Sequence, residues 1–139
     1  MSKYDNLFID ISKKYAEMSY ATKKKVGAVI VKENSIISDG YNGTPIGYDN
    51  SCGGADGKTH WYVMHAEANA ITKLAKYNNN CDNATLYVTL SPCRECAKLI
   101  IQSGIKKVVY CEKYRDTSGI DFLGKLNVEC IQYNDGKRD

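Results

Sequence analysis

Residues 85–111, TLYVTLSPCRECAKLIIQSGIKKVVYC, decide the fold of this chain. Thr85–Leu90 and Lys107–Cys111 are rich in β-branched residues, which predicts two strands. Between them Ser91–Ser103 predicts a helix, because its proline stands at a permitted early position, and Gly104 ends it. A strand, a helix and a second strand in this order predict parallel pairing through a right-handed crossover.

Working outward from this unit, hydrophobic periodicity predicts three more helices and three more strands. The helices are expected over Ser2–Ser19, His65–Tyr77 and Gly119–Leu126, and the strands over Val26–Val31, Ile36–Gly40 and Val128–Tyr133. The first helix should bury one stripe formed by Tyr4, Leu7, Phe8, Ile11, Tyr15 and Met18. The first two strands should form an antiparallel hairpin through Glu33-Asn34, and residues 42–64 a long irregular segment. The predicted fold is α/β: a three-layer α/β/α arrangement with a mixed five-stranded sheet and helices on both faces.

The composition is that of a globular protein. The 139 residues predict one domain over 1–139, and 43% hydrophobic and 25% charged residues exclude a disordered chain or a coiled coil. No run of 18 apolar residues and no signal-like N-terminus is present, so we expect a cytoplasmic protein without a membrane partner. A net charge of +3 favours a small anionic ligand over nucleic acid.

The strongest chemical signal combines His65-Ala66-Glu67 with Pro92-Cys93-Arg94-Glu95-Cys96. Imidazole nitrogen and thiolate sulfur are the ligands that zinc prefers, and the start of a helix favours thiolate. His65, Cys93 and Cys96 therefore predict one Zn²⁺ site. Three protein ligands leave a fourth position for water, which is typical of catalytic rather than structural zinc.

Glu67 is the candidate catalytic residue. On a regular helix a residue at i+2 points away from residue i, so His65 and Glu67 share a site only if His65 caps the helix. In that case Glu67 lies beside the metal and can carry protons. Alone, the Cys-x-x-Cys pair also fits a redox pair or half of a structural site. The two motifs in this order are the combined signature of zinc-dependent nucleobase deaminases.

With these motifs the chain resembles the deoxycytidylate (dCMP) deaminases of the cytidine deaminase superfamily. Four blocks carry the resemblance: Val26-Gly27-Ala28, Gly40-Tyr41-Asn42-Gly43 with Pro45 and Gly47, His65 through Ile71, and Ser91 through Ile105. The resemblance implies hydrolytic deamination of dCMP to dUMP and ammonia. Glu67 would deliver protons to N3 and to the departing amino group.

The resemblance also implies substrate-binding residues, namely Asn42, Ser91 and Tyr114. Each has a plainer alternative in the sequence. Asn42 fits a turn followed by Gly43, Ser91 fits a helix cap, and Tyr114 fits packing, since the chain has 11 tyrosines.

Regulation is a further implication. Many members of this family are hexamers that dCTP activates and dTTP inhibits, and an Mg²⁺ ion would accompany such a triphosphate. The effector residues are expected to be Lys24, Gly40, Tyr41, Asn42, Gly43, Lys73 and Lys76. Solvated surface lysines are the alternative. Regulated members often carry arginine where Lys76 stands, and lysine keeps the charge but loses the bidentate fork.

Two rival functions remain open at this point. A polynucleotide deaminase, of the tRNA adenosine type, shares both motifs but needs a basic, aromatic groove for a flipped base. A non-catalytic nucleotide-binding zinc protein would not need Glu67 or an open ligand position. Cys52 and His60 lie in the long irregular segment without an obvious third and fourth ligand for a second zinc.

Overall fold

The computed structural model describes residues 2–135, and it confirms the predicted fold class. Four helices are present: α1 (Lys3–Ala16), α2 (Ala66–Lys76), α3 (Arg94–Ser103) and α4 (Ser118–Lys125). The five strands are β1 (Gly27–Lys32), β2 (Ser35–Tyr41), β3 (Thr85–Leu90), β4 (Lys107–Glu112) and β5 (Glu129–Gln132). Each element starts and ends within three residues of its predicted bounds. No helix in this part of the chain is long and apolar enough to cross a membrane.

The sheet is mixed, with the strand order β2-β1-β3-β4-β5. β1 pairs antiparallel with both β2 and β3, whereas β3, β4 and β5 are parallel. The hairpin turn is the predicted one, since Glu33 and Asn34 both have positive φ, 52° and 60°. Two positive φ values in succession characterise a type I′ turn, which matches the twist of the flanking strands.

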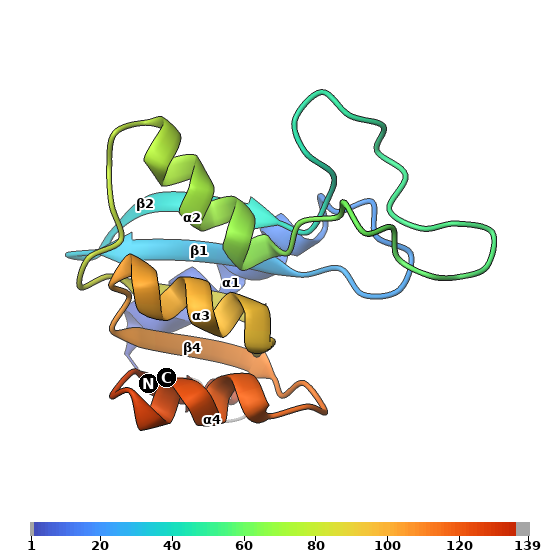
Figure 1. The fold of residues 1–139 in the computed structure, drawn as a ribbon. Helices are drawn as coiled ribbons and strands as arrows, with labels where there is room; N and C mark the ends of the chain where they lie inside the picture. Colours follow the sequence, from blue (N-terminus) through green and yellow to red (C-terminus); the bar gives the residue numbers. More distant parts are fainter. Residues whose placement is uncertain (1, 136–139) are drawn as a thin grey trace.

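Helices cover both faces of the sheet unequally (Figure 1). On one face, α2, α3 and α4 pack on a core that includes Ile30, Leu86 and Val108. On the other face, α1 packs alone, through Phe8 and Ile9, on a smaller core. On the first face, α2 and α3 lie side by side and start at the same end of the sheet (Figure 1). His65 and Cys93 lie at these two helix starts.

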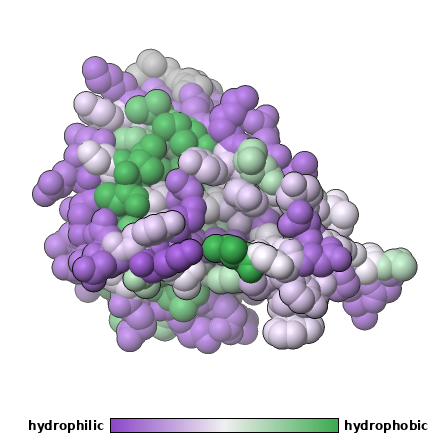
Figure 2. Space-filling model, turned by 90° about the horizontal axis from the view of Figure 1, so that it is seen from above, coloured by the Kyte–Doolittle hydropathy of each residue, from purple (hydrophilic) through white to green (hydrophobic). Residues whose placement is uncertain are grey.

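The buried face of α1 differs from the predicted stripe. Asn6, Phe8, Ile9 and Ser12 are buried, whereas Tyr4, Leu7 and Met18 are exposed. The reason is close approach to β1: a Cβ on Gly27 would lie 2.0 Å from the carbonyl oxygen of Ser12. The helix therefore turns the small Ser12 toward Gly27 of the strand, and Phe8 and Ile9 fill the remaining contact with the sheet. Figure 2 shows hydrophobic side chains gathered in one area of an otherwise mainly hydrophilic face.

The irregular segment between β2 and α2 projects beyond the sheet (Figure 1). Its two ends are tied together, because Gly43 and Met64 exchange backbone hydrogen bonds of 3.0 and 2.7 Å. A second bridge joins Gly53 and Thr59. These ties bring the chain back to the start of α2 and so fix where His65 enters the helix.

Candidate active site

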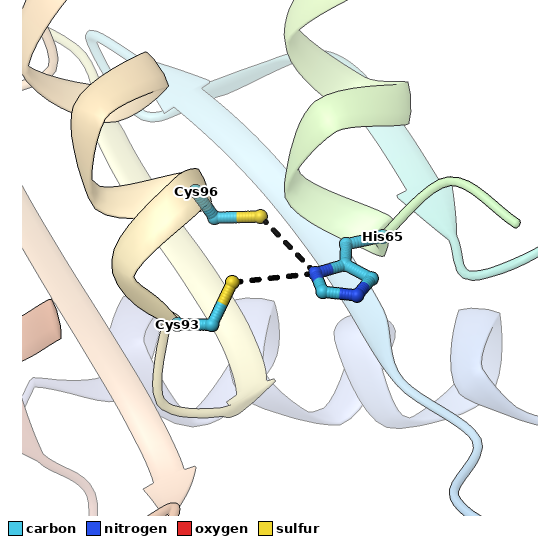
Figure 3. Close-up of side chains that lie close together, drawn as sticks. All are labelled: His65, Cys93 and Cys96. Atoms are coloured by element: carbon cyan, nitrogen blue, oxygen red, sulfur yellow. Dashed lines mark hydrogen bonds between the residues drawn. The ribbon is translucent and has the colours of Figure 1, made fainter. Parts of the chain in front are cut away.

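The side chains of His65, Cys93 and Cys96 form one cluster (Figure 3). The Nδ1 atom of His65 lies 3.4 Å from the Sγ atom of each cysteine. A tetrahedral zinc ion with the usual Zn–N and Zn–S lengths would separate such atoms by about 3.6 Å. The cluster is the one group of three or more metal-ligating side chains within residues 2–135. Its donor set and spacing therefore fit Zn²⁺.

Helix starts position these ligands. His65 is the N-cap of α2 and Cys93 the N-cap of α3, and both have extended backbone dihedral angles. Neither side chain makes a capping hydrogen bond, so both are directed to the cluster instead. Cys96 lies in the first turn of α3. The structure thereby meets the condition under which His65 and Glu67 can serve one site.

The two thiols differ in acidity. The pKa of the Cys93 thiol is lowered to about 3, first by the hydrogen bond with Cys96 and then by the one with His65. The pKa of Cys96 is raised, first because this thiol donates that hydrogen bond and then because it is buried. Without metal the pair loses its first proton easily and retains the second. A dication can displace that second proton, as expected for a metal-binding pair.

Glu67 is buried, with 4% of its surface exposed, although it is a carboxylic acid. Burial raises its pKa from the ordinary value of 4.5 to about 7. A carboxyl group with this pKa can both accept and donate a proton near neutral pH, which is the property of a general acid–base catalyst.

A cavity of about 250 Å³ opens onto these groups. Its lining includes Glu67, His65 and Cys93 together with Asn42, Ser91 and Tyr114. The structure thus brings every predicted catalytic and substrate-binding residue to the cavity or, for Cys96, to the adjoining ligand cluster. Lys24, a predicted effector residue, also lines this cavity, whereas Lys73 and Lys76 do not.

Asn42 and Ser91 have structural partners in the cavity wall. The Asn42 amide donates to the Lys24 carbonyl oxygen, and its Oδ1 accepts from the Val26 N–H, both at 2.8 Å. The Ser91 hydroxyl accepts from the Tyr114 N–H at 2.7 Å. These contacts differ from the plainer alternatives. Asn42 bonds to the backbone of Lys24 and Val26 rather than within a turn, and the N-cap of α3 is Cys93 rather than Ser91.

The remaining predicted effector residues lie around a second cavity of about 500 Å³. They are Gly40, Tyr41, Gly43, Lys73 and Lys76. Gly40 also permits close packing, because a Cβ there would lie 2.6 Å from the carbonyl oxygen of Ala66 in α2. Lys73 is paired with Asp39 of β2 at 2.5 Å.

Sequence reasoning missed Glu112 and Asp39, which pair with Lys24 and Lys73. No local pattern marks either acid, since the partners are 88 and 34 residues apart. Cys52 and His60 are joined through a backbone hydrogen bond of 2.8 Å. They belong to no metal-ligating group of three or more within the described part of the chain.

Comparison with known proteins agrees with the geometry. Residues 2–112 match the family model of the cytidine and deoxycytidylate deaminase zinc-binding region. The deoxycytidylate deaminase of Enterobacteria phage T4 is 40% identical over 131 residues, covering 65% of this chain and 68% of that protein. The human deoxycytidylate deaminase is 39% identical over 130 residues, covering 83% of this chain and 68% of that protein.

A solved structure is similar over nearly the whole fold. The dCMP deaminase of cyanophage S-TIM5, crystallised with dCMP and dUMP, superposes with a TM-score of 0.92 at 40% identity. The match covers 96% of this chain and 98% of that one. Together with the zinc-type ligand cluster and the buried acid, these similarities place the chain in the cytidine and deoxycytidylate deaminase family.

Proposed function

We propose that the protein hydrolyses dCMP to dUMP and ammonia. The observation that carries the proposal is Glu67, a buried carboxyl group in the cavity that the His65–Cys93–Cys96 cluster adjoins. His65, Cys93 and Cys96 would hold the zinc ion. When bound, zinc supplies a water molecule that is acidic enough to react at neutral pH.

Glu67 performs the proton transfers in this proposal. Its carboxylate takes a proton as water adds to C4 of the cytosine ring, and it delivers that proton to N3. It then takes the proton of the hydroxyl group now on C4 and passes it to the exocyclic amino group. The C4–N bond breaks as the C4 carbonyl forms, because the amine leaves as ammonia only when protonated. One carboxyl group can serve both steps, because a group whose pKa is raised to about 7 can both accept and donate a proton near neutral pH.

The substrate would occupy the cavity between the cluster and the rim. Asn42, Ser91 and Tyr114 line the same space as Glu67. We assign them to nucleotide binding. Because Asn42 and Ser91 already hold neighbouring backbone groups, their contribution includes keeping the cavity in shape for the nucleotide.

The rival functions are less well supported. A polynucleotide deaminase needs an extended basic surface. Here three basic side chains are instead paired with carboxylates. They are Lys24 at the first cavity, Lys73 at the second cavity and Arg94 on α3. A non-catalytic zinc protein would give no reason for burying Glu67, because an unneeded buried acid destabilises the fold.

We further propose that the second cavity binds nucleotide effectors, dCTP as activator and dTTP as inhibitor. Lys73 and Lys76 supply cations, and an Mg²⁺ ion would accompany the triphosphate. The exposed apolar residues of α1 and α4, such as Leu7 and Phe122, fit a homo-oligomer, for which we propose a hexamer. Six unpaired cysteines fit a cytoplasmic location.

Ammonia release by the zinc-loaded protein tests the proposed reaction. The panel contains dCMP, deoxycytidine and a tRNA, each with and without dCTP or dTTP. We expect turnover of dCMP that rises with dCTP and falls with dTTP. Turnover of the tRNA alone would favour the polynucleotide function, and no turnover of any substrate by zinc-loaded protein would favour the non-catalytic one.

A further inference from the structure

Two short segments, residues 22–26 and 112–114, meet beside the first cavity, which Lys24 of the first and Tyr114 of the second line. Asn42 fixes the first segment through the backbone of Lys24 and Val26, at 2.8 Å each. Ser91 fixes the second, because its hydroxyl accepts from Tyr114 and its N–H donates to the Glu112 carbonyl oxygen at 2.9 Å. The positions of Lys24 and Glu112 are therefore set by residues of the cavity itself.

An ion pair joins the two segments. The Nζ atom of Lys24 lies 2.5 Å from the Oε2 atom of Glu112, and both side chains are about half exposed, at 51% and 61%. Among the ion pairs of residues 2–135, this is the one that includes a side chain lining the first cavity. The pair thus places a carboxylate directly beside a lysine that lines the cavity.

The charges matter because the substrate in the proposed function is an anion. With the pyrimidine ring beside Glu67, the phosphate is at the far end of the nucleotide. Lys23 and Lys24 are the lysines that line the cavity. A phosphate that binds Lys24 must compete with the Glu112 carboxylate for the same ammonium group. Each further phosphate adds negative charge close to that carboxylate.

We propose that Glu112 is a specificity-determining residue that selects nucleoside monophosphates against diphosphates and triphosphates. It does so by pairing with Lys24 and by repelling longer phosphate chains that reach Lys24. The inference rests on the proposed function, and it adds a residue that makes no contact with the pyrimidine. Exposed charges at this separation change affinities by factors of about two to five, and salt screens them.

The test compares the wild-type protein with Glu112→Gln, which keeps the size of the side chain and removes its charge. We expect kcat/KM to rise about 1.5-fold for dCMP and about fivefold for dCDP, and to stay unchanged for deoxycytidine. The preference for dCMP over dCDP would fall about threefold, and 0.5 M salt would reduce the difference between the proteins. Glu17→Gln is the matched control, because Glu17 pairs with Lys14 on α1, at 3.3 Å.

Binding of the products dUMP and dUDP, measured by calorimetry, gives the same comparison without turnover. If zinc-loaded wild-type protein fails to deaminate dCMP, the proposed function is wrong, while the binding ratio still decides the role of Glu112. An unchanged preference for the monophosphate in Glu112→Gln would overturn the inference. So would an equal change for deoxycytidine and dCMP, because that result indicates a structural role.

Discussion

The side-chain amide of Asn42 donates a hydrogen bond to the carbonyl oxygen of Lys24 at 2.8 Å. This contact joins the end of the β hairpin to the segment that precedes β1, so Asn42 holds part of the cavity wall whether or not a ligand is bound. The same side chain accepts from the N–H of Val26, so both the oxygen and the nitrogen of the amide hold that segment.

Asn42→Ala should therefore destabilise the ligand-free protein by about 1–2 kcal/mol, because the partly buried N–H of Val26 and the exposed carbonyl of Lys24 lose their partner. Urea unfolding measures this change, and Asn50→Ala, at an exposed position, is the control. We also expect KM for dCMP to rise more than kcat falls. If the ligand-free stability were unchanged while KM rose, Asn42 would act only through the substrate.

Glu67→Gln should keep the metal and lose turnover. Glutamine has the shape of glutamate but cannot transfer a proton, and general acid–base catalysis contributes about 10²–10⁴-fold. Elemental analysis gives the zinc content, and ammonia release gives the rate. A variant that retained more than a tenth of the activity would remove Glu67 from the proposed proton transfers.

Cys93→Ala should abolish zinc binding, because it removes one of three ligand atoms that lie within 4.8 Å of one another. We expect about one zinc per chain in the wild type and almost none in the variant. Cys130→Ala is the control, since that thiol lies outside the cluster and burial raises its pKa to about 11. A full zinc content in Cys93→Ala would show that the ligand set is wrong.

Much of the fold was predictable because it depends on local patterns. Glu33-Asn34 specifies a hairpin turn, Gly104 ends α3 with a φ of 86°, and strand β3 has its predicted bounds. The metal ligands were predictable for the same reason, since a helix start fixes both Cys93 and Cys96. Each of these features is determined by a few residues that are neighbours in the sequence.

Features that depend on long-range packing were not predictable. The face that α1 buries follows from its contact with Gly27, and the Lys24–Glu112 ion pair joins residues 88 apart in sequence. Both depend on how closely elements approach in three dimensions, which no periodicity records. Lys24 was accordingly grouped with Lys73 from sequence, although the two line different cavities.

Tyr87 gives a pH dependence whose sign follows from its environment. Burial, and then the hydrogen bond from its hydroxyl to Asp5 at 2.6 Å, raise the pKa above the ordinary value of 10. The stabilisation is present below about pH 10, where the unfolded state is also protonated, and is lost as pH rises toward the folded-state pKa.

Tyr87→Phe should accordingly be less stable than the wild type by about 1 kcal/mol at pH 8, with the difference shrinking between pH 10 and pH 11. Urea unfolding at each pH measures both free energies. Tyr48→Phe is the control, because Tyr48 is exposed. A difference between wild type and Tyr87→Phe that stayed constant up to pH 11 would show that the hydroxyl is not held in its protonated form.

The last prediction concerns the second cavity. Lys73 is already paired with Asp39, whereas Lys76 makes no ion pair within residues 2–135 and lies 5.8 Å from the centre of the Tyr77 ring. Lys76 is thus the lysine of this cavity that an anionic effector can engage without breaking an ion pair. Lys76→Glu should raise the half-maximal concentrations of dCTP and dTTP about tenfold or more, because a favourable charge becomes a repulsive one.

Initial rates of dCMP deamination at increasing effector concentration measure this shift, with Lys125→Glu on α4 as the control. Equal responses in wild type and Lys76→Glu would remove Lys76 from the effector site, and a wild type without any response would contradict the proposed regulation itself.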